Sequence, residues 1–492
     1  MSKPQILIVG GGYAGFYTAK KLEKLLRSGE ADVTLVDPLP YMTYQPFLPE
    51  VVAGSIEPRH SVVSLRRHLT KTNIITGKVV KVNHAKKLAT IEVAGAPAYE
   101  WKYDHIVMTA GAVSRTFPIP GVADVAIGMK TIEEAMNVRN RIHKNFDIAA
   151  NLPKGPARDR LLTFVVVGGG FAGIETIAEM RSLATYLLRF YPGIAFNDVR
   201  FHLIEAMGRI MPEVSLDTSL WVVDNLESRN AKVHLNTQLL SAVGGKVDLS
   251  TGESFESDLI VWTAGVKANP FVPNSDLPLD ERGRIFAKAS LQVAAGDKVV
   301  EGAWTAGDVS AVPDLSGDGV GGYCVPNAQH AVRQAKLLAK NIASTIRGGE
   351  VKNYFHKNLG AVAGLGVGIG VFQWRNVAIK GFPAWVMHRG YHGLAMPMWE
   401  RKIRVFAGWL WNWVLRRDIV SITASQTPRL AFESSASRPA AAAPAAKKAP
   451  AKKAPAKKVA AKKVAAKPVA KKAAAKAPVK KAAPKKAAPK KK

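Results

Sequence analysis

Two glycine-rich turns and a repeated Thr-Ala-Gly segment predict an α/β protein with two Rossmann-like domains, one inserted in the other. The turns, GGGYAG at 10–15 and GGGFAG at 168–173, each follow a short aliphatic run and precede a helical pattern. A Thr-Ala-Gly segment follows each turn, at 109–111 and 263–265, and TAGD occurs at 305–308. Strand, glycine turn and helix in this order form the dinucleotide-binding unit of doubly wound sheets.

The first unit begins with the predicted strand Ile6–Val9. Gly10 permits the tight turn, Gly12 lets backbone N–H groups approach a pyrophosphate, and Gly15 lets the helix pack closely on the strand. The N-terminus of the helix then faces the phosphates. The next predicted strand, DVTLVD, ends in Asp37, which is placed to accept hydrogen bonds from an adenosine ribose.

The second unit repeats each part, with a predicted strand Thr163–Val167, the glycines Gly168, Gly170 and Gly173, and a strand VRFHLIE that ends in Glu205. The acid lies farther from the glycines than the usual twenty or so residues. The stretch RFYPGIAFND, which is typical of a helix extension and a loop, accounts for the delay. A carboxylate at this strand end would repel a 2′-phosphate, so we expect NADH rather than NADPH.

The Thr-Ala-Gly segments follow two further predicted strands, HIVM and LIVW, and we expect Thr109, Gly111 and Gly265 to bind the cofactors. The TAGD segment returns the chain to the first domain, where Asp308 can bind the ribityl chain of FAD. A resident FAD and an exchanging NADH explain why the unit occurs twice. We predict five segments: a first FAD-domain part (1–120), an NADH domain (121–282), a second FAD-domain part (283–345), a C-terminal domain (346–430) and a disordered tail (431–492).

The charge and cysteine content exclude several classes of protein. The net charge of +31 is concentrated in residues 439–492, which hold nineteen Lys and no acid, so the remaining chain carries +12. The single cysteine, Cys324, excludes a redox-active CxxC pair. We expect no metal site. No uninterrupted apolar run is long enough to span a bilayer, and the first ten residues do not match a signal peptide.

The order of these motifs resembles that of the type II NADH:quinone oxidoreductases over residues 4–428. The segment YMTYQPFLPEVVAGSIEPR at 41–59 is similar to the loop that encloses the flavin in that family, and LGAVAGLGVGIGVFQ at 359–373 resembles the strand that opens its C-terminal domain. The resemblance implies FAD and NADH as cofactors, a quinone, either menaquinone or ubiquinone, as acceptor, and no proton pumping.

The resemblance also implies three catalytic residues. The quinone-site motif of the family, AQxAxQ, is matched by Ala328, Gln329 and Ala331, but Arg333 takes the place of the second Gln, and Gln334 follows it. Gln329 is expected beside the flavin ring, or else to cap or pack its helix. Glu175 resembles the acid of the family near the nicotinamide, and the alternative is a solvated first-turn Glu that the helix dipole favours.

A helix with an apolar stripe is predicted near the C-terminus, with Ile403, Phe406, Trp409 or Leu410, and Trp413 on one side and Arg at both ends. This pattern is typical of helices that lie in a membrane surface, which would place the protein at the cytoplasmic face of the cell membrane. Alternatively, the stripe packs on its own domain or on the second subunit of a homodimer.

The Lys, Ala and Pro repeats of the tail are expected to bind anionic lipid or, without sequence specificity, nucleic acid. Two other functions stay open at this stage. One is a soluble NADH-dependent flavoprotein reductase with a different acceptor, which the displacement of Gln334 favours. The other is a scaffolding protein whose basic tail binds nucleic acid or membranes.

Overall fold

A computed structural model of the chain describes residues 3–317, 319–357, 360–421, 429 and 433. The residues up to Pro428 form one compact unit, to which all the elements below belong. The stretch that we predict to be disordered, 431–492, lies outside the described residues except for Glu433. None of the described helices is long and apolar enough to cross a membrane.

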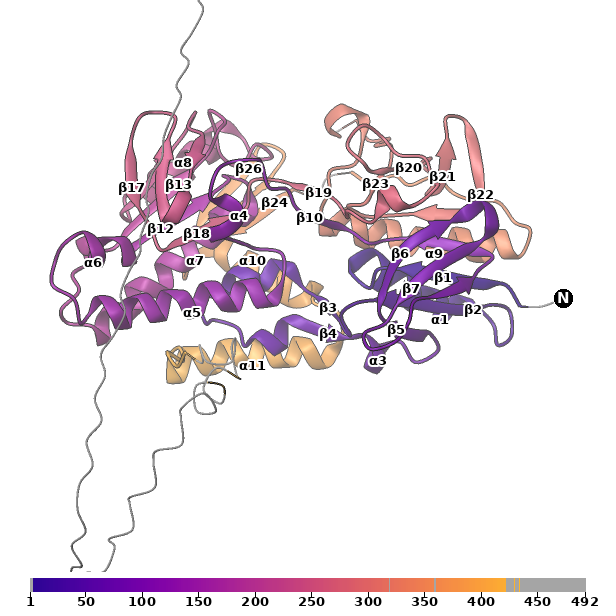
Figure 1. Cartoon of the computed structure of the whole chain (residues 1–492), viewed down its shortest axis with the longest axis horizontal. Helices are drawn as coiled ribbons and strands as arrows, with labels where there is room; N and C mark the ends of the chain where they lie inside the picture. The colour runs from indigo at the N-terminus through magenta and orange to yellow at the C-terminus, as the bar shows by residue number, and fades with distance from the viewer. Residues whose placement is uncertain (1–2, 318, 358–359, 422–428, 430–432, 434–492) are drawn as a thin grey trace, which may run out of the picture. The chain divides into compact units, whose positions relative to one another are not determined.

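A six-stranded sheet forms the centre of the first domain, in the order β21-β22-β9-β1-β2-β5 (Figure 1). Neighbouring strands pair in parallel except β21 and β22, which form an antiparallel hairpin. The strand before the first glycine turn is central and buried, which explains its continuous aliphatic run. The strands are β1 (Gln5–Val9), β2 (Asp32–Asp37), β5 (Asn73–Thr76), β9 (His105–Met108), β21 (Gln292–Ala295) and β22 (Lys298–Thr305).

Two helices, α1 (Tyr13–Leu25) and α9 (Ala328–Ile346), pack against each other in this domain. Small residues at the contact let the backbones approach closely. The Thr18 hydroxyl donates a hydrogen bond to the carbonyl of Ala14 and lies 3.5 Å from that of Ala335 on the other helix. This contact fixes α9, which carries Gln329 and Gln334, relative to the first glycine turn.

A five-stranded parallel sheet forms the second domain, in the order β11-β18-β12-β13-β14. The helix after the second glycine turn, α7, begins at Phe171, within that turn. Two 3₁₀ turns, Leu188–Phe190 and Phe196–Asp198, occupy the stretch for which we predicted a helix extension and loop. The elements are β11 (Ala126–Gly128), α5 (Ile132–Ala149), β12 (Thr163–Val167), α7 (Phe171–Leu187), β13 (Arg200–Ile204), α8 (Leu216–Glu227), β14 (Ala231–His234) and β18 (Leu259–Trp262).

Two antiparallel strands, β10 (Ala112–Ser114) and β19 (Val266–Ala268), connect the domains. After β19 the chain is already back in the first domain, because Val272 is buried there and Asp276 accepts a hydrogen bond from the backbone N–H of His84 at 2.6 Å. Val272 and Asp276 therefore contact the first domain before the predicted boundary at residue 282. Sequence patterns did not show this, because the returning segment contains no long element.

The C-terminal segment forms a three-stranded antiparallel sheet, β24 (Ala361–Gly364), β25 (Gly370–Trp374) and β26 (Val377–Gly381), followed by α10 (Phe382–Ala395) and α11 (Trp399–Leu415). The single strand predicted over 359–373 is wrong, because it is two strands of a hairpin. Gly366 and Gly368 have φ of +89° and +79°, and this left-handed conformation turns the chain between the strands.

Smaller elements complete the unit. Two three-stranded sheets flank the domains, and short pieces form the loop after β2. They are β3 (Tyr41–Thr43), α2 (Leu48–Val52), β4 (Val62–Ser64), α3 (Leu65–His68), β6 (Lys78–Asn83), β7 (Leu88–Glu92), β8 (Tyr99–Lys102), α4 (Val122–Val125), α6 (Pro156–Leu161), β15 (Leu239–Ser241), β16 (Lys246–Leu249), β17 (Ser254–Glu256), β20 (Ile285–Phe286) and β23 (Ser310–Ala311).

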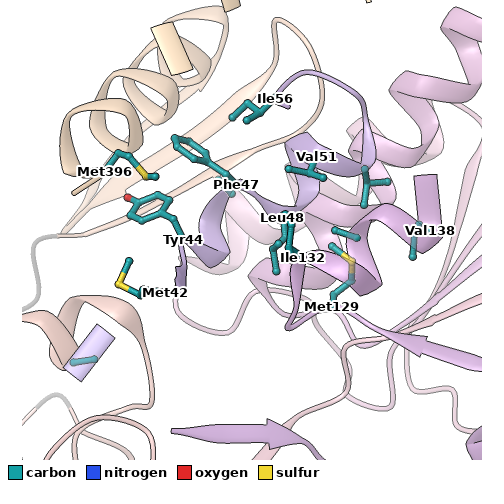
Figure 2. Close-up of a cluster of buried hydrophobic side chains, with 14 of the residues drawn as sticks. Met42, Tyr44, Phe47, Leu48, Val51, Ile56, Met129, Ile132, Val138 and Met396 are labelled. Carbon is teal, nitrogen blue, oxygen red and sulfur yellow. The ribbon is translucent and has the colours of Figure 1, made fainter. Parts of the chain in front are cut away.

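The loop at 41–59 is buried between several parts of the fold (Figure 2). Its Tyr44 and Phe47 rings lie 4.8 Å apart, and α2 packs on both α5 and α7. Met396, at the end of α10, belongs to the same apolar cluster. Trp409 of α11 meets Phe47 edge to face at 5.9 Å. The loop is thus held by both the second domain and the C-terminal helices.

Candidate functional site: two nucleotide turns and a buried polar cluster

Close backbone packing shapes the first glycine turn. A Cβ atom on Gly15 would lie 1.8 Å from the carbonyl oxygen of Gly10, so only glycine lets α1 approach β1 this closely. Gly10 itself has φ of +100°, which favours glycine. A Cβ on Gly12 would meet no atom within 4 Å, so this side of the turn is open in the way that a bound pyrophosphate requires.

The carboxylate of Asp37 holds this turn from the side. One oxygen accepts a hydrogen bond from the backbone N–H of Gly11 at 2.6 Å, and the other accepts one from Leu39 at 2.7 Å. Burial raises the pKa of Asp37, and the two N–H groups partly offset this. Each carboxylate oxygen can accept a second hydrogen bond, so the pair can still bind ribose hydroxyls.

The second turn repeats this geometry. A Cβ on Gly173 would lie 1.9 Å from the carbonyl oxygen of Gly168, and one on Gly170 would meet nothing. One oxygen of Glu205 accepts a hydrogen bond from the backbone N–H of Gly169 at 2.6 Å, and the other from Met207 at 2.7 Å. The longer Glu side chain therefore does the same work as Asp37 in the first turn.

The Thr-Ala-Gly segments close the rim of each turn. The Thr109 hydroxyl lies 3.0 Å from the carbonyl oxygens of both the last strand residue and the first turn glycine. The Thr263 hydroxyl makes the same two contacts in the second copy, at 2.9 and 3.1 Å. Gly111 and Gly265 follow with φ of +66° and +93°, and the space beside both is open.

Asp308 lies just after β22, where burial raises the pKa of its carboxyl group. Lys130, which precedes α5, lies 4.0 Å from this carboxylate and partly offsets the effect. A capping box between Thr131 and Glu134 fixes the start of α5 and thereby the position of Lys130. The Tyr13 hydroxyl of the first glycine turn is buried with no hydrogen-bond partner among the described residues. These groups converge where a flavin of the first domain would lie.

Gln334 has a contact that the sequence analysis did not predict. Its side chain is 2% exposed, and its amide oxygen accepts a hydrogen bond from the backbone N–H of Gly307 at 2.8 Å. One helical step of about 100° past the family position turns the side chain inward. The residue that we expected to contact quinone therefore holds the turn that carries Asp308.

Gln329 remains accessible in the first turn of α9. Asn327 caps this helix, because its side chain accepts a hydrogen bond from the backbone N–H of His330 at 2.8 Å. The capping role considered for Gln329 is thus wrong, and its half-buried amide has no hydrogen bond within the described residues. No hydrogen bond or ion pair within the described residues joins Gln329 to Glu175 either.

Cys324 is buried, which raises the pKa of its thiol to about 11.

Glu175 is the fifth residue of α7, just past the first turn, and its side chain is largely buried rather than solvated. One carboxylate oxygen accepts a hydrogen bond from the backbone N–H of Gly364 at 2.9 Å and lies 2.9 Å from Nε2 of His388. Burial raises the pKa of Glu175 to about 7, while it lowers the pKa of His388 to about 4. Near neutral pH this pair therefore consists of a neutral imidazole and a carboxyl group that can hold or release a proton.

A chain of polar rings leads from this pair to the loop at 41–59. The rings of His388 and His392 lie 4.7 Å apart, one helical turn from each other on α10. Nδ1 of His392 lies 3.2 Å from the hydroxyl of Tyr44, and burial lowers the pKa of His392 to about 3. The Tyr44 ring in turn lies 6.0 Å from that of Tyr13 in the first glycine turn. Glu175 is thus connected to the first nucleotide turn through buried polar side chains.

Two more buried acids lie beside this chain. Glu50 of α2 accepts a hydrogen bond from the Trp409 indole at 2.8 Å and pairs with Arg389 at 3.1 Å. Glu179, one turn after Glu175, has a carboxylate oxygen without a hydrogen-bond partner among the described residues. Burial raises the pKa of Glu179 to about 7, and Arg417 partly offsets this. These charges join α2, α7, α10 and α11.

One group of described residues has the ligand types of a metal site: His202, His234 and Glu253. The facing nitrogens of the two imidazoles are 3.0 Å apart, and the ring centroids are 5.3 Å apart. Both nitrogens therefore lie on the line that joins the rings, as in an N–H···N hydrogen bond, whereas a metal needs lone pairs that converge. Lys232 also binds the carboxylate of Glu253 at 2.7 Å. We assign no metal here.

The chain belongs to the pyridine nucleotide-disulphide oxidoreductase family, whose model matches residues 4–335. It is therefore an oxidoreductase of the two-nucleotide type, although its single cysteine leaves it without the redox disulfide in the name of the family. The predicted α/β class and the family resemblance are confirmed.

The chain is similar to proteins with a more specific name. The type II NADH:quinone oxidoreductase of Staphylococcus haemolyticus is 29% identical over 387 residues, which are 77% of this chain and 92% of that protein. The one from Mycobacterium tuberculosis is 27% identical over 86% of this chain and 91% of that protein. The solved structure of NDH2 from Plasmodium falciparum in complex with NADH has a similar fold, with a TM-score of 0.78 at 18% identity over 85% of this chain and all of that chain.

Several residues of the site were not predicted. His388, His392 and Tyr44 come from segments far apart in the chain, so no local spacing connects them. Lys130 is the only one with a local signal, because Thr131 and Glu134 form the sequence pattern of a capping box directly after it. A buried acid such as Glu179 has no sequence signature at all, since helix periodicity does not distinguish a paired interior Glu from a solvated one.

Proposed function

We propose that the protein is an FAD-dependent NADH dehydrogenase that delivers electrons to a membrane quinone. The observation that carries the proposal is the doubled glycine turn, each copy with its own carboxylate, within one compact unit. Two nucleotide turns suit a resident and an exchanging dinucleotide. The relatives that are named type II NADH:quinone oxidoreductases match most of this chain and support the choice of acceptor.

The first domain fits FAD. Gly12 leaves room for the pyrophosphate, Asp37 faces the position of the adenosine ribose, and Asp308 with Lys130 offers a carboxylate and a cation for the ribityl chain and ring. The unpartnered hydroxyl of Tyr13 is a further polar group that a bound ligand would satisfy. FAD supplies hydride and electron transfer chemistry, while the protein positions and polarises the ring.

The second domain fits NADH. Gly170 leaves the pyrophosphate position open, and Glu205 offers both carboxylate oxygens at the ribose. A negative charge there disfavours the 2′-phosphate of NADPH. Glu175 lies two residues past the last turn glycine, on the side toward β24, where it can orient the carboxamide of the nicotinamide or hold a proton.

The buried polar cluster around Glu175 can also supply protons for the reaction. Reduction of a quinone by NADH consumes a proton from solution in addition to the hydride, so a buried reaction centre needs groups that titrate near neutral pH. Glu175 meets this requirement, because burial raises its pKa to about 7. His388 lies within 2.9 Å of it, and His392 and Tyr44 extend the path toward the first domain. Gln329 is the polar group of α9 that stays free to bind the quinone carbonyl.

The helices α10 and α11 support binding to a membrane surface. On one side of α11, Val405 and Trp409 pack on the enzyme itself. This side therefore matches the alternative interpretation of the apolar stripe, in which the helix packs on its own domain. The adjoining side of the helix is apolar and exposed. Its large residues are Trp399, Ile403, Phe406, Leu410, Trp413 and Val414, and α10 adds Phe382, Val386, Tyr391 and Leu394. Trp and flanking Arg suit the headgroup boundary of a bilayer.

The test uses purified full-length protein. We expect bound FAD at one per chain, oxidation of NADH at least about tenfold faster than of NADPH, and turnover with ubiquinone or menaquinone analogues. Protein without flavin would refute the assignment of the first domain. Turnover with ferricyanide but with neither quinone would refute the acceptor and favour the soluble reductase, since ferricyanide accepts electrons from most exposed flavins.

A further inference from the structure

The exposed side of α11 contains a groove that the proposed reaction does not use. Six apolar residues and one cation line it, and we call it the α10–α11 groove: Leu394, Trp399, Lys402, Ile403, Phe406, Ala407 and Leu410. Trp399, Ile403 and Leu410 are 75%, 64% and 58% exposed, so large apolar side chains surround an open groove rather than fill it. Soluble surfaces rarely present such a continuous apolar area without a partner.

Lys402 is the polar group of this groove. Its ammonium donates a hydrogen bond to the carbonyl of Leu394 at 2.6 Å and lies 5.1 Å from the centre of the Trp399 ring. The first contact ties α11 to α10, and neither contact neutralises the charge. Within the described residues no carboxylate pairs with Lys402, so an uncompensated cation lies at the rim of an apolar groove.

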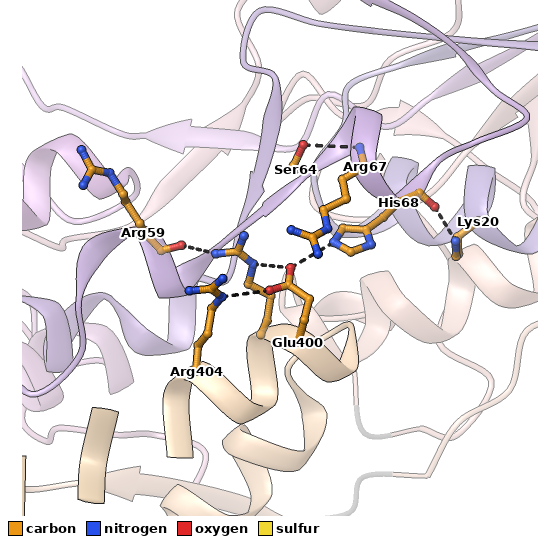
Figure 3. A network of polar contacts seen from close by, with 8 residues as sticks. Lys20, Arg59, Ser64, Arg67, His68, Glu400 and Arg404 are labelled. Atoms are coloured by element: carbon orange, nitrogen blue, oxygen red, sulfur yellow. Dashed lines mark hydrogen bonds and ion pairs between the residues drawn. The ribbon is translucent and has the colours of Figure 1, made fainter. Parts of the chain in front are cut away.

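The first turn of α11 also carries a cluster of basic groups around Glu400 (Figure 3). The Glu400 carboxylate is shared by Arg401 at 2.8 Å, Arg404 at 3.1 Å and His68 at 3.3 Å, so one acid serves several basic groups. Arg59 is exposed, and its carbonyl oxygen, not its guanidinium, is bound by Arg401. In the described part of the chain neither Arg59 nor Arg67 has an acidic partner. Basic side chains therefore gather around Glu400 at the start of α11, next in sequence to Trp399 and close to Lys402.

We propose that the α10–α11 groove binds one acyl chain of an anionic phospholipid whose phosphate lies beside Lys402. The inference rests on the proposed binding to a membrane surface and names the lipid that this surface selects. A cation at the rim of an open apolar groove favours an amphiphile with a negative head, because phosphate and ammonium attract each other at the bilayer interface. A quinone tail is uncharged and gains nothing from Lys402. A second copy of the chain would bring the same basic cluster against itself.

The test measures which lipid contacts Trp399. Full-length protein is bound to vesicles of phosphatidylcholine with phosphatidylglycerol, and dibrominated chains, which quench Trp fluorescence on contact, are carried by one lipid or the other at equal mole fraction. The Trp399→Phe variant isolates the contribution of this residue. About 0.5 M salt weakens binding by the basic tail, because the Debye length then falls to a few ångströms.

We expect Trp399 to be quenched roughly fivefold more by brominated phosphatidylglycerol than by brominated phosphatidylcholine. Lys402→Gln should lose this preference. Lys298→Gln, which removes an exposed charge from the β21–β22 hairpin and leaves the tail unchanged, should keep it. Equal quenching by both lipids, or equal behaviour of the two Lys variants, would overturn the inference. So would displacement of the brominated lipid by an added quinone, which would make the groove a quinone site.

Two control measurements separate this inference from the proposed function. Oxidation of NADH by ferricyanide, which needs no membrane, should be equal in wild type and Lys402→Gln, because Lys402 lies outside the nucleotide turns. Vesicle flotation reports membrane binding as such. Protein that floats without lipid preference overturns only the lipid site, whereas protein that does not float in either salt condition overturns the membrane assignment together with it.

Discussion

Two glycines of the second turn, Gly173 and Gly170, should respond differently to the same added methyl group. In Gly173→Ala the Cβ would lie 1.9 Å from the backbone oxygen of Gly168 and 2.7 Å from the Thr263 hydroxyl. Alanine is favoured over glycine inside a helix by about 1 kcal/mol. Overpacking against a rigid backbone costs about 1–3 kcal/mol. Because the closest contact is with backbone that cannot move aside, the overpacking cost lies near the upper end, about 3 kcal/mol, and after the helix gain we expect a net loss of about 2 kcal/mol.

Gly170→Ala provides the matched control. Gly170 has φ of −73°, which any residue adopts, and its Cβ would meet no atom within 4 Å. We therefore expect unchanged stability of the protein. The methyl group would nevertheless occupy the side of the turn that the NADH pyrophosphate approaches, so the KM for NADH should rise at least about tenfold, which corresponds to about 1.4 kcal/mol of binding.

The assay combines thermal unfolding with steady-state NADH oxidation by ferricyanide. Gly173→Ala should lower both Tm and NADH affinity, whereas Gly170→Ala should lower NADH affinity alone. The equivalent pair in the first turn, Gly15→Ala and Gly12→Ala, should show the same contrast in stability and both should release flavin. Wild-type KM in Gly170→Ala would show that NADH does not lie on this turn, and wild-type Tm in Gly173→Ala would contradict the packing argument.

Three further predictions concern buried polar groups. Gln334→Ala leaves the N–H of Gly307 unpaired, at a cost of about 1–3 kcal/mol, so this variant should release flavin faster. Gln329→Ala should slow quinone turnover and retain flavin. Equal flavin retention in the two variants would contradict the role of Gln334 in holding the turn that carries Asp308. Wild-type quinone turnover should fall as the pH rises through about 7, where Glu175 loses its proton, and Glu175→Gln should be slower without that step; a step that persists in the variant would assign it to another group. For Glu179 the folded pKa of about 7 exceeds the unfolded value of 4.5, so its stabilising contribution is full below pH 4.5 and is lost as the pH rises through 7, by about 3 kcal/mol. Denaturant unfolding of Glu179→Gln should show a shallower decline between pH 5 and 8 than wild type, and an equal decline would place the titration elsewhere.

The nucleotide turns show how much local sequence can predict. Strand, glycine spacing and terminal acid lie within a few dozen residues, and backbone sterics allow only glycine where helix and strand touch. Both turns therefore follow from the sequence, whereas the hydrogen bonds of Asp37 and Glu205 to their own loop N–H groups were not predicted. The hairpin at 361–374 was predicted wrongly as one strand, although the glycines that turn it were visible, because a continuous apolar run does not reveal its own bend.

The role of Gln334 depends on the direction in which its side chain points, and a sequence motif does not give that direction. Its displacement by one position is visible in the sequence, but the direction in which that step turns the side chain depends on the packing of α9 against α1. The same packing brings a small residue of α1, Ala14, beside Gly307. The side chain therefore meets a backbone N–H where a quinone contact was expected.

By itself, the sequence determined the α/β class, the two nucleotide turns, their acids and the basic tail, because each of these depends on neighbours in the chain. Only the tertiary structure decided which carboxyl groups are buried. Glu175, His388, His392 and Tyr44 come from three distant segments, and the pKa of Glu175 is raised to about 7 only because folding removes water from around it. Desolvation depends on what packs around a residue from the whole chain, and a linear pattern does not record it.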